Sequence, residues 1–372
     1  MSAPPAKAPL ADFSSDTATR PTDAMRRFMC EAEVGDEQKC EDPTVNALLA
    51  RVCRQLGKDA AIFLPSGTMC NEVALAVHCR RGDEVLMDRT AHALNFEAGG
   101  PAVIAGAIVR TIDGHRGVFT ADQVRSSLRP ESRYAPRARL LVVEQTSNLG
   151  GGTCWPLDVI EDVCGVAHSH GLVAHLDGAR LFNAVIASGV EVSRFSDPFD
   201  SVWVDFSKGL GAPMGAVLAG SEAFIDEAWR WKQRLGGALR QAGIAAAACI
   251  YALDHHVERI AEDHANAQRL ARGLATIPGV SLDLEAVQTN IVLFDIGSTG
   301  ATAEYLASQL IKNHAVRASV VGRTLLRMVT HLNASLEDAA AAVEAVRSTL
   351  AVWRSEETRS TCLAIEFKED RS

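Results

Sequence analysis

The amino-acid sequence predicts an α/β body with a largely parallel sheet, followed by a smaller α+β domain. Two observations support this prediction: short apolar runs alternate with amphipathic stretches over most of the chain, and the pattern then changes. The length of 372 residues allows about two to three domains. We expect a tail over 1–12, a large domain over 13–258, a small domain over 259–353 and a second tail over 354–372.

Strands and helices are expected to take turns along the large domain. The expected strands are short apolar runs: Ala60–Leu64, Glu84–Met87, Ala102–Ile104, Ala107–Thr111, Leu140–Glu144, Leu172–Leu176, Ser201–Phe206 and Gly215–Ala219. The expected helices carry apolar residues at helical spacing: Pro43–Leu56, Met69–Cys79, Leu157–His170 and Ser221–Leu235. Such βα units predict that the carboxyl ends of most strands share one edge of the sheet, where ligands bind.

The last third of the chain has a different pattern. One long helical stretch is expected from Ile244 to Leu274, followed by short strands and two helices. These later elements are Val280–Leu284, Asn290–Asp295, Ala303–Asn313, the hairpin-like pair Val316–Val321 and Thr324–His331, and Leu336–Leu350. They predict a compact α+β unit.

The composition excludes several classes of protein. Hydrophobic residues make up 47% and charged residues 22%, which is typical of a globular chain. With 46 acidic and 37 basic residues the formal charge is -9, so a nucleic-acid partner is not expected. Nine cysteines without a CxxC pair indicate reduced thiols in the cytoplasm. No apolar stretch is long enough to span a membrane.

The histidines of the long helical stretch raise the question of a metal. His256, Glu258 and His264 lie close together in the sequence, but their spacing is not that of a helical HExxH site. A solvated polar face is the favoured interpretation, and no metal is expected.

Polar residues directly after the expected strands are the candidates for chemistry. Ser66, Gly67 and Thr68 follow a strand and open a helix, so they would form either a phosphate cradle or a plain N-cap. Asp177 ends another strand and is either a turn residue or the partner of a protonated heterocycle. Lys208 is either a surface lysine or an amine suited to Schiff-base chemistry.

Two further candidates are weaker when taken alone. His92 would be either a catalytic group or a satisfied core histidine, and Arg327 on a late strand would be either a ligand or half of an ion pair. The glycine-rich run Gly209–Gly215 lacks the GxGxxG spacing, which argues against a nicotinamide cofactor.

The order of these features is typical of fold-type I pyridoxal phosphate enzymes, and the chain resembles the L-threonine aldolases of the β-eliminating-lyase group. The resemblance runs from Asp12 to about Leu350. Its strongest blocks are Glu41–Thr44, Pro65–Met69, His175–Ala184, Ser207–Pro213 and Gly236–Gly243. It implies the fold-type I transferase-like fold and pyridoxal 5'-phosphate as cofactor.

The resemblance also implies a role for each matched residue. Lys208 matches the lysine that carries the cofactor, Asp177 the partner of the pyridine nitrogen, and His92 the ring that stacks on the cofactor. The other implied cofactor contacts are Ser66, Gly67 and Thr68 at the phosphate, Arg180 at the phenolic oxygen, and Arg240 at the phosphate of a neighbouring subunit. The implied contacts of the substrate carboxylate are Ser15, Arg180 and Arg327.

Two departures from the family pattern fall at substrate-binding positions. Ser147 stands where the family commonly has a histidine associated with the substrate hydroxyl, and a serine is no equivalent base at neutral pH. Lys39 and Cys40 stand where tyrosine and glycine are usual, so a cation replaces a neutral aromatic group. We expect that the cofactor chemistry is retained and that the preference for the side chain of the substrate is altered.

The function expected from these residues is a cytoplasmic aldolase. It would cleave a β-hydroxy-α-amino acid into glycine and an aldehyde by breaking the Cα–Cβ bond, and the resemblance implies an oligomer built as a dimer of dimers. A carboxylate clamp would select that bond by holding it perpendicular to the cofactor ring. A β-eliminating lyase, an amino-acid racemase and a catalytically idle interaction protein remain as alternatives, although intact Lys208 and Asp177 argue against the last.

Overall fold

The computed structural model describes the backbone of residues 11–369 and the side chains of residues 11–355. The chain divides into a large unit, Thr19–Ala261, and a small unit formed by the chain up to Ala18 and from Glu262 onward. Residues 13–18 were expected in the large domain but belong to the small unit, because Phe13 is buried in the core of that unit.

A seven-stranded sheet forms the centre of the large unit. Its strands are β2 (Ala60–Leu64), β3 (Glu84–Asp88), β4 (Ile108–Ile112), β5 (Ala138–Glu144), β6 (Val173–Gly178), β7 (Ser201–Asp205) and β8 (Ala216–Gly220). Their order is β2-β8-β7-β6-β5-β3-β4, and only the pairs that include β8 are antiparallel. The predicted α/β class with a mostly parallel sheet is therefore confirmed.

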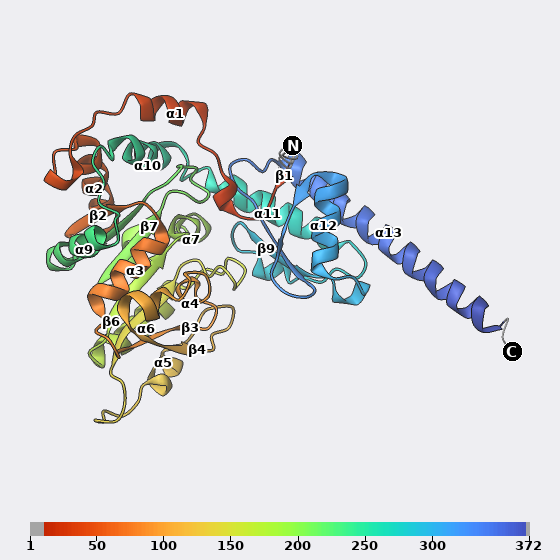
Figure 1. Cartoon of the computed structure of the whole chain (residues 1–372), viewed down its shortest axis with the longest axis horizontal. Helices are drawn as coiled ribbons and strands as arrows, with labels where there is room; N and C mark the ends of the chain where they lie inside the picture. The colour runs from red at the N-terminus through yellow and green to blue at the C-terminus, as the bar shows by residue number, and fades with distance from the viewer. Residues whose placement is uncertain (1–10, 370–372) are drawn as a thin grey trace, which may run out of the picture. The chain divides into compact units, whose positions relative to one another are not determined.

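Helices cover both faces of this sheet (Figure 1). On one face pack α3 (Gly67–His78) and α9 (Glu222–Arg234); on the other pack α2 (Pro43–Leu56), α6 (Leu157–Ser169) and α10 (Gly243–His255). Alternate residues of β7 separate the faces: Val202 and Val204 join one core, and Trp203 joins the core under α3. Shorter helices of this unit are α1 (Asp23–Cys30), α4 (His92–Asn95), α5 (Ala121–Ser127), α7 (Leu181–Ser188), α8 (Val192–Ser196), η2 (Glu37–Lys39) and η3 (Pro101–Ala105).

Two expected elements of this region were wrong. The expected strand Ala102–Ile104 lies in η3, where Val103 is 78% exposed and so has no buried face to direct it into the sheet. The expected single helix from Ile244 is two helices, α10 and α11 (Ile260–Ala275). Between them His256 is buried, not solvated as expected, and its Nδ1 lies 2.7 Å from the Leu210 carbonyl oxygen.

The small unit pairs helices with two small sheets. The strands are β1 (Ala11–Asp12) with β10 (Val316–Arg317), and the antiparallel set β11 (Ser319–Val320), β12 (Leu325–Val329) and β9 (Ile291–Asp295). The helices are α11, α12 (Ala303–His314) and α13 (Leu336–Glu369), with the 3₁₀ turns η1 (Asp16–Ala18), η4 (Leu284–Ala286) and η5 (Gly297–Thr299).

The small unit differs from the expectation at three places. Only Ser281 of the expected strand Val280–Leu284 bridges to another strand, at Asp295, because the chain turns into η4. The expected tail 354–372 continues α13 as far as Glu369. Ala11 and Asp12 of the other expected tail pair with β10, and residues 1–10 lie outside the described residues. None of the described helices is long and apolar enough to cross a membrane.

Candidate active site

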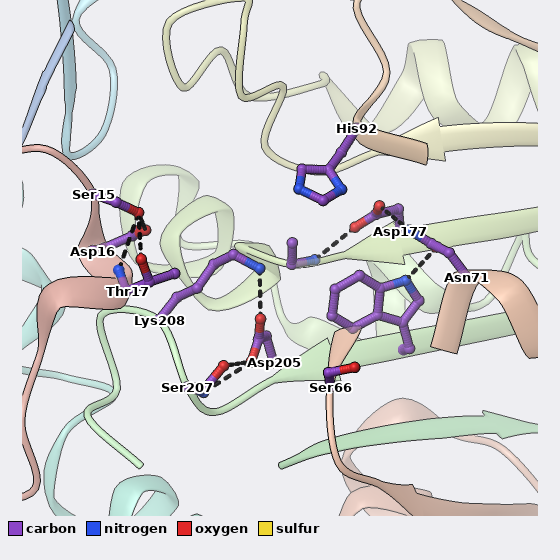
Figure 2. Close-up of polar contacts among 12 residues, drawn as sticks. Ser15, Asp16, Thr17, Ser66, Asn71, His92, Asp177, Asp205, Ser207 and Lys208 are labelled. Atoms are coloured by element: carbon purple, nitrogen blue, oxygen red, sulfur yellow. Dashed lines mark hydrogen bonds and ion pairs between the residues drawn. The ribbon is translucent and has the colours of Figure 1, made fainter. Parts of the chain in front are cut away.

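Lys208 lies just past the carboxyl end of β7, as the sequence predicts. Its Nζ donates to Oδ2 of Asp205 at 2.5 Å (Figure 2). The Asp205 side chain is 2% exposed. The backbone N–H and hydroxyl of Ser207 donate to the other oxygen of Asp205, at 2.8 and 2.7 Å. The amine also lies 5.5 Å from the centroid of the Trp203 ring. The strand end therefore holds the amine between a buried acid and an aromatic face.

Asp177 lies at the neighbouring strand end, near the end of β6, and is buried. Its Oδ2 accepts from Nδ2 of Asn71 at 2.8 Å, and its Oδ1 accepts from the Ala179 backbone N–H at 3.1 Å (Figure 2). A carboxylate offers about four acceptor positions, so these two bonds leave capacity for one more N–H donor.

His92 opens α4 and is held by two acids. Its Nδ1 lies 2.8 Å from Oε1 of Glu97, and its backbone N–H donates to Oε2 of Glu144 at 2.7 Å. Burial lowers the pKa of His92, but the hydrogen bond to Glu97 and the charges of Asp177, Glu97 and Glu144 outweigh burial and raise this pKa above its ordinary value. The acids around the ring therefore stabilise the protonated form of His92 relative to that of a free histidine.

Glu144 joins the loops that follow β3 and β5. Its Oε1 accepts from the backbone N–H of Asn148 at 2.8 Å, while Oε2 accepts from His92. Burial, followed by the charge of Asp177, raises the pKa of Glu144 to about 7. The sequence did not single out Glu144, Asn71 or Asp205 as site residues.

Ser66, Gly67 and Thr68 lie at the first turn of α3. The Ser66 hydroxyl accepts from the Met69 backbone N–H at 3.3 Å, so this residue does form an N-cap. A Cβ on Gly67 would lie 2.2 Å from the Trp203 ring, so glycine is required for the helix to approach that ring. The N–H groups of Gly67 and Thr68 precede the first helical hydrogen bond and point out of the helix end.

Arg180 and Ser147 lie in the loops beyond β6 and β5. Arg180 is buried and lines one small cavity together with Lys208 and Asp205. Ser147 is also buried, and its hydroxyl accepts from the Gly150 backbone N–H at 3.3 Å. A Cβ on Gly117 would lie 2.0 Å from this hydroxyl, so the side chain at position 147 is closely packed.

Lys39 and Arg240 lie on the surface of the large unit. Lys39 is exposed at the end of η2, and the next residue, Cys40, has a φ of 59°, the left-handed conformation that glycine adopts most readily. Arg240 pairs with Asp36, with Nη1 3.0 Å from Oδ2.

Ser15 and Arg327 both belong to the small unit. The Ser15 hydroxyl accepts from the backbone N–H and the hydroxyl of Thr17, at 3.2 and 2.9 Å (Figure 2). Arg327 on β12 donates from Nη2 to the carbonyl oxygen of Ser14 at 3.0 Å. The fold thus brings these residues, which are far apart in the sequence, to adjoining positions.

Comparison with known proteins agrees with this arrangement. The chain matches the family model described as beta-eliminating lyase over residues 12–296. It belongs to the beta-eliminating lyase family. The low-specificity L-threonine aldolase 1 of Arabidopsis thaliana is 40% identical over 307 residues, which cover 81% of this chain and 86% of that protein. The low specificity L-threonine aldolase of Escherichia coli (strain K12) is 39% identical over 343 residues, 91% of this chain and 99% of that protein.

Solved structures share the fold of this beta-eliminating lyase family member. A threonine aldolase of Leishmania major has a TM-score of 0.78 at 17% identity and covers 91% of this chain and 99% of its own. A PLP-dependent aminotransferase of Streptococcus suis has a TM-score of 0.72 at 14% identity, covering 92% and 94%. The predicted family resemblance and fold are confirmed, and the protein is a pyridoxal-phosphate-dependent carbon–carbon lyase.

The side chains of the large unit suit this cofactor chemically. The strand-end amine suits the aldehyde of the cofactor, and the buried carboxylate with spare acceptor capacity suits its ring nitrogen. The histidine ring suits its flat ring, and the first turn of a 12-residue helix suits its phosphate.

Proposed function

We propose that this protein is a low-specificity threonine aldolase that cleaves β-hydroxy-α-amino acids into glycine and an aldehyde. One observation carries the proposal: Lys208 and Asp177 stand, each beside a buried polar partner, at neighbouring strand ends, in a chain whose relatives are named low-specificity L-threonine aldolases. When bound, the cofactor supplies an electron sink for the bond that breaks at Cα.

Each candidate residue of the large unit has its own proposed role toward the cofactor or the substrate. Asp177 keeps a ring nitrogen protonated through charge pairing, and Lys208 binds the cofactor aldehyde. His92 lies against the ring, and its hydrogen bond to Glu97 holds the orientation of the imidazole. Ser66, Gly67 and Thr68 bind the phosphate through the helix end.

The proposed carboxylate contacts are arginines and one serine. Arg180 is supported by its place in the same small cavity as Lys208. Ser15 and Arg327 are proposed as further contacts, supported by the Arg327 hydrogen bond to Ser14 that holds them at adjoining positions. A guanidinium binds a carboxylate through two parallel hydrogen bonds, which fixes its orientation as well as its affinity.

The substrate side chain is proposed to meet an altered environment. Ser147 already accepts a backbone hydrogen bond and is closely packed, so it replaces the usual histidine without replacing its basicity. Proton removal from the substrate hydroxyl then passes to another base, for which we propose His92, a water molecule or the cofactor phosphate. Lys39 adds an exposed cation, which favours polar or anionic β-substituents.

We further propose a cytoplasmic homotetramer built from dimers. Arg240 supports this assembly because its side chain is 60% exposed, so its guanidinium is accessible to a phosphate on another subunit. Ile244, which follows closely in sequence, is 49% exposed and offers apolar area beside it.

The deciding experiment is a product analysis with purified protein and pyridoxal phosphate. Threonine, phenylserine and hydroxyaspartate are supplied separately, and glycine, aldehyde, pyruvate, ammonia and the enantiomeric amino acid are measured. Equal amounts of glycine and aldehyde are expected. Pyruvate with ammonia, or an inverted amino acid without glycine, would replace the aldolase assignment with elimination or racemisation.

A further inference from the structure

The side chain of Asn71 bridges two buried carboxylates in the large unit. Its Nδ2 donates one hydrogen bond to Asp177 Oδ2 and another to Glu97 Oε1, each at 2.8 Å. Asn71, Glu97 and Asp177 are 1%, 3% and 2% exposed. Two acids buried this close repel each other, and a shared N–H₂ group offsets that repulsion.

The orientation of this amide is determined by a third contact. Trp203 Nε1 donates to Asn71 Oδ1 at 2.8 Å, and an indole nitrogen can only donate. The oxygen of the amide must therefore face Trp203, and both amide hydrogens must face the carboxylates. Asparagine is the side chain that satisfies one donor and two acceptors at this place.

Glu97 extends the bridge to His92. Its Oε1 lies 2.8 Å from Nδ1 of His92, while its Oε2 is buried and accepts no hydrogen bond from the residues that the structure describes. Among the described residues, the hydrogen-bond partners of Glu97 are thus Asn71 and His92, and both contact its Oε1. The result is one continuous chain of contacts, Asp177 to Asn71 to Glu97 to His92.

We propose that Asn71 and Glu97 are positioning residues that set the orientation of the Asp177 carboxylate and the ring orientation and charge of His92. The inference rests on the proposed function, which gives Asp177 and His92 their roles toward the cofactor. Asn71 acts on the ring-nitrogen partner, and Glu97 acts on the stacking ring, so loss of either reaches both ends of the chain of contacts.

The charged groups that face His92 determine what each change does. They are Glu97 after α4, Asp177 on β6 and Glu144 on β5. A Glu97→Gln change keeps the shape but removes the nearest negative charge, so the pKa of His92 falls. An Asn71→Leu change keeps the branched shape with a larger volume and removes both amide hydrogens and the acceptor of Trp203, so Asp177 loses its orientation and its separation from Glu97.

The test uses the full chain, with Ser201→Ala as the matched control. Ser201 is buried on β7 and bonds His175 and His78 instead of the candidate site. The pKa of His92 is measured by NMR titration before pyridoxal phosphate is added, and the cofactor Kd is then measured by absorbance. Thermal unfolding reports stability for every variant.

Three results are expected. Glu97→Gln lowers the His92 pKa, Asn71→Leu raises the cofactor Kd by about tenfold or more, and Ser201→Ala lowers stability while leaving both readouts unchanged. If the wild-type protein binds the cofactor and Glu97→Gln and Asn71→Leu match it in both readouts, the inference is overturned and the proposed function stands. A wild-type protein that binds no cofactor overturns the proposed function instead, while the His92 titration still decides the role of Glu97. If Asn71→Leu does not fold, Glu97→Gln decides.

Discussion

The contact between helix α3 and the central sheet has charged polar groups at one end and neutral polar groups at the other. At the upper end, which lies near the candidate cofactor site, Asn71 of α3 donates a hydrogen bond to Asp177 of β6. At the lower end, two helical turns further along α3, His78 hydrogen-bonds Ser201, which also hydrogen-bonds His175 of β6. His175 lies two residues before Asp177 on the same face of the strand.

The lower end is neutral because the hydrogen-bond partner that its two histidines share is a hydroxyl, and because burial outweighs the nearby charge of Asp200. Burial lowers the pKa of His78 to about 4 and that of His175 to about 3. The Ser201 oxygen lies 2.8 Å from His78 Nε2 and 2.7 Å from His175 Nδ1, so it donates to one neutral ring and accepts from the other.

The upper end shows the opposite outcome for a partly buried histidine. The pKa of His92 rises despite its burial, because carboxylates surround it. Burial alone therefore does not decide the charge of a histidine here; the charge of its hydrogen-bond partners does. The upper end should therefore govern catalysis and the lower end stability.

Removal of the amine at the upper end should have the largest effect. Lys208→Ala is expected to reduce turnover by on the order of 10³-fold or more, because no neighbouring group replaces the amine that binds the cofactor. Borohydride reduction followed by peptide mapping measures the covalent adduct. An adduct that persists in the variant would identify a different lysine as the carrier.

Loss of the upper-end charge should have the next largest effect. Asp177→Asn keeps the shape and should preserve the fold, but turnover should fall by on the order of 10²-fold because an amide cannot pair with a protonated ring nitrogen. Steady-state kinetics and thermal unfolding are measured together. Wild-type kinetics in this variant would place the ring-nitrogen partner elsewhere.

The lower end should control stability in acid. The unfolded pKa of a histidine is about 6.5, whereas the folded values of His78 and His175 are about 4 and about 3. Below pH 6.5 the unfolded chain binds protons that the folded chain excludes, so stability falls with falling pH, by up to about 1.4 kcal/mol per pH unit for each histidine. His92 has the opposite sign: its raised pKa contributes stability below pH 6.5 that is lost as pH rises through its folded value.

A single variant isolates the acid effect. His175→Leu should lose less stability than the wild type between pH 6.5 and 4.5, and its cofactor affinity should stay within about twofold of the wild type. Urea unfolding at a series of pH values measures the difference. Parallel pH curves for the two proteins would show that His175 does not remain neutral in the folded state.

The smallest effect is expected at the exposed cation. Lys39→Tyr should lower the efficiency on hydroxyaspartate relative to phenylserine by about two- to fivefold, since a solvent-screened charge contributes little. Ser147→Ala serves as the comparison, because it removes the buried hydroxyl without adding volume. The ranking of substrates in the wild type and both variants is the readout, and an unchanged ranking would exclude Lys39 from specificity.

The sequence predicted the residues at strand ends better than the residues that support them. Asp177 and Lys208 follow apolar runs, so both their positions and their chemistry could be predicted from the sequence. Asn71 and Glu97 lie inside or just after helices, where polar residues usually face solvent. One signal was available: Asn71 and His78 are seven residues apart, which places two polar groups on the buried face of a helix.

The sequence by itself determined the family, the parallel sheet and the candidate cofactor residues, because strand periodicity and short motifs are local properties of the chain. The tertiary structure decided which acids surround His92, which histidines stay neutral, and that Phe13 joins the small unit. Those outcomes depend on partners brought together from distant parts of the chain, and on the burial that makes their charges count.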